Sequence, residues 1–242
     1  YKRQVVTDPS GDAWVALNIK TPAAVTRGLN IPNQENAITG EYEIEDVKAI
    51  FFDGDQDASL VTKVIDLSTG SGDLTSSGAS SSSKAFQIPA TSKTILIIAN
   101  PGTGFSSVGE GSSFVDVNKA VKDESITTSV AKTGTFLMTN SKGHLEPSDN
   151  SGNTINLTLY KSQDVAVKNP LAIYIDRVVA KVRVYTSDGA MDNSTASIYS
   201  PKWILNVTNK WYYPVSRRIK TWNEDPANTP DCLLYTSPSP RD

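Results

Sequence analysis

Short runs of apolar residues alternate with polar residues along most of the chain, and clusters of Gly, Pro, Asn, Asp and Ser separate these runs. Because successive side chains of a strand point to opposite faces, a period of two predicts strands with one buried face. The sequence therefore predicts an all-β fold, an antiparallel β-sandwich. The expected strands lie in residues 15–19, 42–52, 60–67, 94–99, 154–160, 171–185 and 203–207.

Two of these segments have a predictable place in the sandwich. Within residues 42–52, the side chains of Val47, Ala49 and Phe51 share one face. Residues 94–99 are apolar on both faces, which predicts a central strand covered on both sides.

One helix and one long loop complete the expected pattern. Phe114, Val117 and Val121 recur at helical spacing, and Ser112 or Ser113 can cap the first turn, so a helix is predicted over residues 113–122. Residues 67–84 are rich in Ser and Gly and carry few apolar side chains. This composition predicts an exposed loop between strands.

Charge and cysteine content exclude several classes of function. The 242 residues include 23 basic and 26 acidic side chains, for a net charge of -3, so a nucleic-acid binder with its basic face is not expected. Cys232 and His144 are the only residues of their types, which excludes a Cys/His zinc site. No apolar run approaches the ~18 residues of a membrane span.

Three segments resemble catalytic or ligand-binding motifs without completing them. Asp53 to Asp57 has the alternate carboxylates of a calcium loop, but Ala58 and Val64 stand where the turn glycine and the bidentate Glu belong. Glycines follow the strand at 94–99 as in a dinucleotide fingerprint, but Ser107 replaces the third. His144 is the only base available to a catalytic triad, and it lies in a polar loop. We therefore expect no catalytic residue, no metal and no cofactor, and predict that the protein is not an enzyme.

An aromatic cluster late in the chain permits two interpretations. Aromatic rings form platforms for ligands such as sugars, and they also pack in the cores of β domains. Possible stacking residues are Trp203, Trp211, Tyr212 and Tyr213.

Neither end of the sequence is expected to belong to the fold. The chain opens at Tyr1 without an initiator Met, and residues 1–12 are interpreted as the remnant of a leader. Residues 232–242 resemble the translation of a sequencing adapter, and a disordered Pro/Ser tail is the alternative. Both interpretations remove Cys232 from any catalytic role. We expect the natural protein to continue beyond about residue 230.

Three segments are similar to the fimbrillin-type (type V) pilin subunits of Bacteroidales, especially the group of minor and short-fimbria major subunits. Residues 171–185 (LAIYIDRVVAKVRVY) match the family's Asp/Glu-Arg-x-Val-Ala-Lys/Arg strand, and residues 200–217 match its Trp-containing strand and basic connection. Residues 135–140 (TFLMTN) match its short Met-Thr strand. The resemblance implies a transthyretin-like sandwich with one short helix over residues 28–200, and the start of a second, incomplete β domain over 201–231.

The resemblance also implies a mechanism of assembly. In this family a precursor lipoprotein is cut after an Arg that follows the first strand, and a donor segment of a neighbouring subunit fills the groove left behind. Residues 13–27 have the same order: a strand, a loop with a proline, and an arginine. The implied displaced strand is centred on Val15, Leu17 and Ile19, and the implied processing site is Arg27 and Gly28.

Partners and location follow from the same resemblance. It implies other pilin subunits and an Arg-specific, trypsin-like protease as partners. It places the precursor on the outer membrane, held by its lipid alone, and the mature subunit in a fimbrium on the cell surface.

Two alternatives stay open. A fimbrial-tip or cell-surface adhesin of the same fold would keep its first strand and hold a host protein or glycan through the aromatic cluster or the Ser-rich loop. A secreted β-sandwich enzyme is disfavoured, because no acid, base or metal constellation supports it.

Overall fold

Thirteen strands and two short helices make up the part of the chain that the computed structural model describes, which comprises residues 11–21, 42–54, 58–77, 80–102, 105–118, 131–132, 135–140 and 157–178. The strands are β1 (Asp12–Val15), β2 (Leu17–Lys20), β3 (Asp46–Phe52), β4 (Val61–Ser68), β5 (Leu74–Ser77), β6 (Ser80–Ser83), β7 (Phe86–Pro89), β8 (Thr94–Ala99), β9 (Ala131–Lys132), β10 (Thr135–Phe136), β11 (Met138–Thr139), β12 (Leu171–Tyr174) and β13 (Asp176–Arg177). The helices are α1 (Phe114–Asn118) and α2 (Gln163–Lys168).

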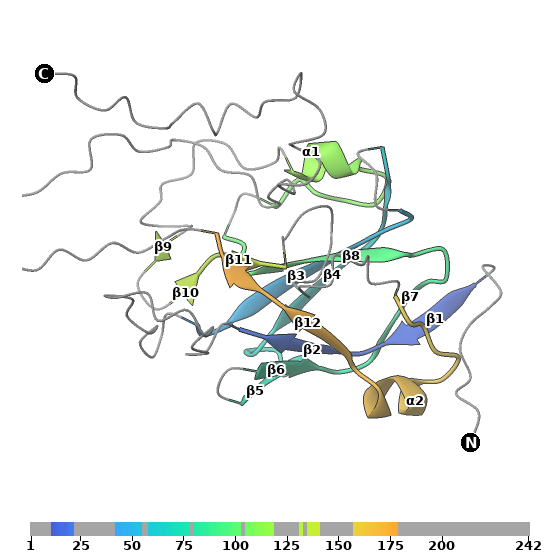
Figure 1. Cartoon of the computed structure of the whole chain (residues 1–242), viewed down its shortest axis with the longest axis horizontal. Coiled ribbons are helices and arrows are strands. Elements are labelled where there is room, and N and C mark those ends of the chain that lie inside the picture. Colours follow the sequence, from blue (N-terminus) through green and yellow to red (C-terminus); the bar gives the residue numbers. More distant parts are fainter. Residues whose placement is uncertain are drawn as a thin grey trace, which may run out of the picture.

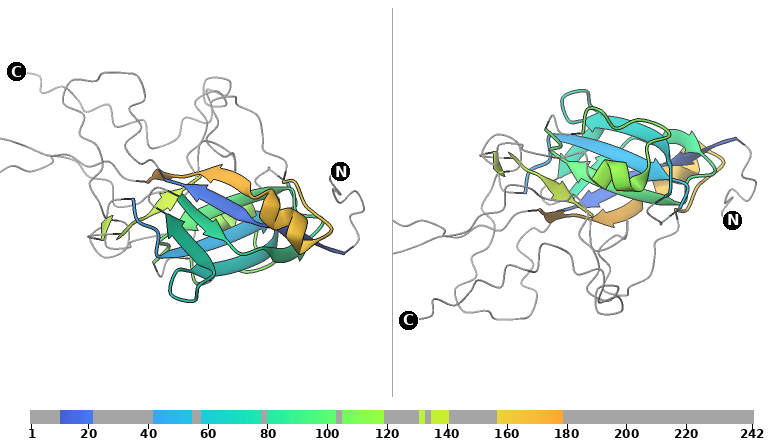
Figure 2. Two further views of the ribbon diagram at one scale, coloured as in Figure 1. Left: turned by 90° about the horizontal axis from the view of Figure 1, so that it is seen from below. Right: turned by 90° about the horizontal axis from the view of Figure 1, so that it is seen from above.

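Two main sheets pack face to face, which confirms the predicted all-β sandwich (Figure 1). The first sheet has five strands in the order β13-β11-β8-β3-β4, and the second has four in the order β12-β2-β6-β5. The pair β1 and β7 continues the strands β2 and β6. Helix α1 packs on the outer face of the first sheet and α2 on the outer face of the second (Figure 2).

The core between the sheets is built from alternate residues of facing strands. As predicted, Val47, Ala49 and Phe51 of β3 share one face, and this face is buried against the second sheet. Phe51 also meets Phe86 of β7 in an edge-to-face contact, with ring centroids 6.0 Å apart. Such pairs add to the free energy gained by burying the rings.

Strand β8 is the centre of the first sheet, and both of its faces are covered. All six of its residues are buried. Ile95 and Ile97 face the inter-sheet core, whereas Leu96 and Ile98 pack beneath α1. The prediction of a central strand covered on both sides is confirmed.

Helix α1 begins where its sequence predicts. The Ser113 hydroxyl accepts a hydrogen bond from the Asp116 backbone N–H (3.2 Å), an N-cap contact. Phe114 and Val117 are buried at helical spacing against the first sheet. The rest of the predicted helix, including Val121, lies outside the described residues.

The Ser/Gly-rich segment 67–84 is not the exposed loop that its composition predicts. Strand β4 extends to Ser68, and β5 and β6 form an antiparallel hairpin. The prediction was wrong because β6 gains a second partner, β2, on its other side. Tertiary strand pairing overrides the weak strand propensity of serine here, and the buried side chains of Leu74 and Ser81 anchor the hairpin to the core.

The other predicted strands are found with changed limits. Segment 15–19 becomes β1 and β2, interrupted at Ala16, and segment 171–185 begins as β12 and β13, which belong to different sheets. In segment 154–160, the described residues 157–160 form a single bridge, between Tyr160 and Trp14. Residues 179–185 and 203–207 lie outside the described part. Among the described helices, none is long and apolar enough to cross a membrane.

Asn100 ties the chain that enters β3 to the body of the first sheet. Its backbone is in the left-handed region (φ 55°), which Asn tolerates better than most residues. Its side-chain oxygen accepts from the backbone N–H of Glu45 (3.0 Å). Its amide nitrogen donates to the carbonyl oxygens of Glu43 and Phe136, each at 2.9 Å.

Replacing Asn100→Asp should lower the free energy of unfolding by roughly 2–4 kcal/mol, because a buried carboxylate would face two carbonyl oxygens with no proton to donate. Urea denaturation followed by circular dichroism measures this loss. Asn169→Asp is the matched control, since the Asn169 amide makes one half-exposed bond to the Val165 carbonyl oxygen (2.9 Å). The control should lose under about 1 kcal/mol, and equal losses in the two variants would contradict the assigned role of Asn100.

Candidate functional site

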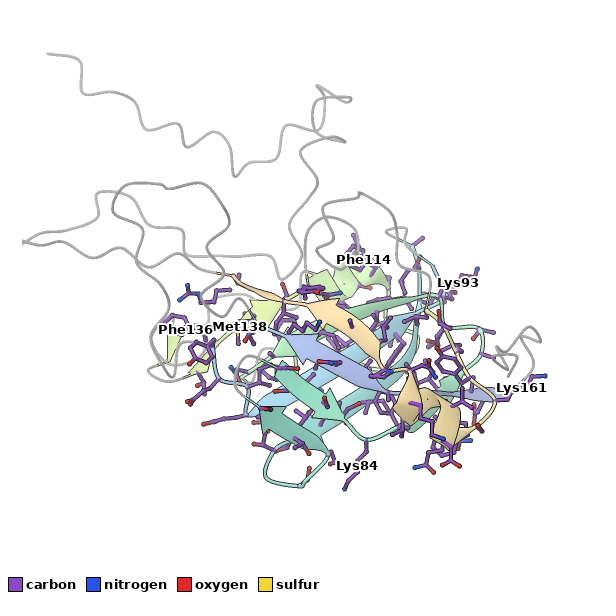
Figure 3. All side chains as sticks on the ribbon, turned by 60° about the horizontal axis from the view of Figure 1, so that its bottom comes forward. Lys84, Lys93, Phe114, Phe136, Met138 and Lys161 are labelled. Atoms are coloured by element: carbon purple, nitrogen blue, oxygen red, sulfur yellow. The ribbon has the colours of Figure 1, made fainter. Side chains whose placement is uncertain are left out.

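The first strand that the structure describes, β1 and β2 together, lies inside the second sheet rather than at its edge. On one side β1 pairs with β7 and β2 pairs with β6, both antiparallel. On the other side β1 bridges to Tyr160, and β2 pairs in parallel with β12. Figure 3 shows β2 between β12 and β6. The first strand is therefore an insert between segments that come much later in the sequence.

Backbone hydrogen bonds hold this insert along its β12 side. Trp14 and Tyr160 exchange two bonds, at 2.7 Å and 2.9 Å. Further along, the Leu171 N–H donates to the Ala16 carbonyl oxygen (2.8 Å), and the Ile175 N–H donates to that of Lys20 (3.0 Å). Since the ladders with β6 and β7 run along the opposite side, removal of the insert would leave two rows of unpaired backbone groups.

The inward face of the insert supplies a row of aliphatic side chains to the core. Val15, Leu17 and Ile19 are at most 1% exposed, and they share the inter-sheet cluster with Ala13. Burial of a Val, Leu or Ile side chain contributes roughly 1.5–3 kcal/mol. The three together contribute an amount comparable with the net stability of a small domain, roughly 5–15 kcal/mol.

On the outward face of the insert only Ala16 is fully buried, although Trp14 is partly buried against the same cluster. Asp12 is exposed, and Trp14, Asn18 and Lys20 are partly exposed, whereas Ala16 is 2% exposed. It packs with Ala85, Tyr160 and Ala166, the last of these on α2. Figure 1 shows α2 lying beside β1 at this end of the sheet.

The pairing of β1 and β2 with β7 and β6 changes register next to Ala16. Asn18 pairs with Ser82, but Val15 pairs with Phe86, so the β6–β7 side carries one more residue than the β1–β2 side. This is the arrangement of a β-bulge, which bends a strand locally. The Leu17 N–H donates to the Ser83 hydroxyl oxygen (2.9 Å).

Charged groups add little to the retention of the insert. The Glu110 side chain, bonded to Lys63 at 2.8 Å, raises the pKa of Lys63, and Asp12 of β1 acts in the same direction more weakly. At the other end, Lys20 lies 5.2 Å from the centroid of the exposed Tyr174 ring. Because exposed pairs of this kind contribute little, core packing and backbone pairing hold the strand.

Several predicted site residues lie outside the described part of the chain. They are the processing site Arg27 and Gly28 and the aromatic residues Trp203, Trp211, Tyr212 and Tyr213. His144 and Cys232, for which no catalytic role is expected, also lie outside it.

The Asp53 turn is described in part. Asp53 accepts a hydrogen bond from the Leu60 N–H through its side chain (2.9 Å) and donates one from its own N–H to the Leu60 carbonyl oxygen (3.1 Å). These bonds fit the predicted turn between β3 and β4. Residues 55–57 are outside the described part, and within it no group of three or more His, Cys, Asp or Glu could hold a metal ion.

Two parts of this site were not predicted from the sequence. The parallel pairing of β2 with β12 joins residues far apart in the chain, and no local pattern signals it. The burial of Ala16 does leave a signal, since a small apolar residue stands at a position where the alternation predicts a polar, outward side chain.

Comparisons with known proteins give distant structural neighbours. No protein-family model and no curated protein matches the sequence. A Parabacteroides distasonis protein with a proposed role in cell adhesion aligns with 69% of this chain and 46% of its own, at 16% identity and a TM-score of 0.38. A fimbrial assembly protein of the same species aligns with 69% of this chain and 54% of its own, at 12% identity and a TM-score of 0.36. The chain thus spans about half the length of each neighbour.

Replacing Leu17→Ala should lower the free energy of unfolding by roughly 2–5 kcal/mol, because it leaves a cavity between the sheets. Chemical denaturation measures the loss. Asn18→Ala is the control, since Asn18 is the next residue of the same strand, is half-exposed and accepts one bond from the Ser80 hydroxyl (2.6 Å). A loss no larger for Leu17→Ala than for Asn18→Ala would show that the first strand does not contribute to the core.

Proposed function

We propose that this chain is a structural subunit of a cell-surface fimbria that polymerises by donor-strand exchange. In this proposal a protease cuts the precursor after Arg27, the first strand leaves, and a strand of a neighbouring subunit takes its place. The observation that carries the proposal is the position of β1 and β2, which are inserted between β6–β7 on one side and Tyr160 and β12 on the other. The similarity of residues 135–140, 171–185 and 200–217 to fimbrillin-type pilins supports it.

The insert can be exchanged without breaking the rest of the chain. Its neighbours belong to segments 80–89 and 160–175, so both walls of the groove stay covalently connected when it leaves. Loss of the insert exposes backbone donors and acceptors on both walls, together with the core residues that face Leu17 and Ile19. A donor strand restores both contributions, since its backbone completes the ladders and its alternate side chains fill the core.

The place of Arg27 in the sequence suits this role. Strand β2 ends at Lys20, so a cut after Arg27 leaves the whole insert on the N-terminal fragment, and the retained part begins at Gly28. A trypsin-like protease needs a cationic residue before the scissile bond, and Arg27 supplies it. A lipid-anchored precursor on the outer membrane and a mature subunit in the fimbrium complete the proposal.

Arg-specific digestion of the precursor, expressed from its complete reading frame, tests the proposal. Intact mass should show a cut after Arg27, and a gel of unboiled samples should show an SDS-resistant ladder, because a donor strand buries the same apolar surface as the strand that it replaces. Arg27→Ala is the control and should yield neither product. A cut precursor that stays monomeric would overturn the proposal and favour the adhesin alternative.

A disulfide across the groove tests whether a cut precursor can polymerise when its first strand cannot leave. Asn18 and Ser82 are directly paired between β2 and β6, and neither side chain is buried, so Asn18→Cys with Ser82→Cys can form a cross-strand disulfide. With Cys232→Ser, which removes the only other thiol of the 242 residues, this precursor should be cut after Arg27 but form no ladder until a reductant is added. A ladder from the oxidised, cut protein would show that polymerisation does not require release of the first strand.

A further inference from the structure

We propose that the position of Ala16 sets the register of the strand that fills the groove, so that a donor strand must carry a small residue there. This inference rests on the proposed donor-strand function and specifies the partner: a strand with aliphatic residues at the four inward positions and Ala, Gly or Ser at one outward position. Its basis is that Ala16 is the single fully buried residue on the outward face of the insert.

The inward pattern alone does not fix the register. Ala13, Val15, Leu17 and Ile19 are all inward and all aliphatic. Because the side-chain period of a strand is two, a shift by one residue would turn these side chains to the outside. A shift by two residues keeps the same face inward and places aliphatic side chains in most of the core positions again.

The outward pattern does distinguish registers that differ by two residues. In the observed register the residue beneath α2 is Ala16, which is 2% exposed and in contact with Ala85, Tyr160 and Ala166. A shift by two in either direction would bring Trp14 or Asn18 to this point. Ala166 and Tyr160 are themselves buried, so the larger side chain could fit only if α2 or the Tyr160 ring moved, which is the cost of overpacking.

The backbone at Ala16 strengthens this constraint. The register of the β6–β7 ladder changes by one residue at this level, and the Ala16 carbonyl oxygen accepts a hydrogen bond from Leu171 N–H at 2.8 Å. At this level the strand is bonded to the β12 side through the Ala16 carbonyl oxygen and to the β6 side through the Leu17 N–H, which donates to the Ser83 hydroxyl oxygen (2.9 Å), and it lies beneath the helix. At Asn18 and Lys20, by contrast, the outward side chains are partly exposed, and larger residues can be accommodated.

Peptide exchange tests the inference without depending on Arg27. In the 242-residue chain, residues 25–30 are replaced by the recognition sequence of a sequence-specific protease. The cut chain is then unfolded in urea and refolded by dilution with an excess of dye-labelled peptide that corresponds to residues 11–21. Fluorescence anisotropy measures the affinity of this peptide and of three variants: Ala16→Gly, Ala16→Leu and the matched control Asn18→Leu.

The Ala16→Leu peptide should bind about tenfold to a hundredfold more weakly than the native peptide, which is the usual range for an overpacked site. The Ala16→Gly and Asn18→Leu peptides should stay within about tenfold of the native one. Tyr160→Ala in the protein should restore binding of the Ala16→Leu peptide, because it removes a ring that encloses the site.

Failure of the native peptide to bind would overturn donor-strand exchange and this inference with it. Binding of the native peptide with equal losses for Ala16→Leu and Asn18→Leu would overturn this inference alone.

Cross-linking reads the register directly. With Ser82→Cys in the protein, the native peptide carrying Asn18→Cys should form the disulfide, because these positions are paired. A peptide with Ala16→Leu and Asn18→Ala moves the small residue by two positions, so its disulfide should form from a Cys at position 20 instead. If this shifted peptide does not cross-link through its Lys20→Cys thiol, or if the peptide with native Ala16 and Asn18 cross-links equally well through Lys20→Cys, Ala16 does not set the register.

Discussion

The sandwich depends on the insertion of its first strand between β12 and β6. Within the described residues, β12 has β2 as its only strand partner, and the hairpin of β5 and β6 joins the second sheet only through β2. Without the insert, β12 and the hairpin of β5 and β6 would no longer be joined by backbone pairing. The same strand supplies Val15, Leu17 and Ile19 to the core. Removing it therefore removes the backbone pairing and the core packing at the same time.

A strand with this role is essential to the fold, and in the proposed assembly another strand replaces it. Its binding energy comes from backbone hydrogen bonds, which any chain can make, and from alternate aliphatic side chains, which many strands carry. β8 of the first sheet is different. It is buried on both faces and connected at both ends to described chain, so it cannot leave without unfolding the domain. In the proposed exchange, the strand that leaves is therefore β1 with β2 and not β8.

The sequence predicts well what local alternation determines. The faces of β3, the double burial of β8 and the start of α1 all follow from residues close together in the chain. It fails for β5 and β6, whose serines form strands because β2 lies beside them, and for the break of the segment 171–185 into two sheets. Both features depend on partners distant in sequence. The same distinction applies to the candidate site. The sequence predicts the aliphatic row of Val15, Leu17 and Ile19, but it does not predict the parallel pairing of β2 with β12.

A groove that recognises only a period-two pattern would accept many strands in several registers. Specificity therefore has to come from a feature that breaks the period, and the insert has one such feature. At Ala16 the alternation of buried and exposed residues is interrupted, the ladder with β6 and β7 changes register, and α2 closes over the outward face. The register change and the small buried residue would each weaken an ordinary strand, since a bulge disrupts pairing and a small residue buries little area. Their coincidence at one residue is what a groove needs if it is to be refilled by a different chain in a single alignment.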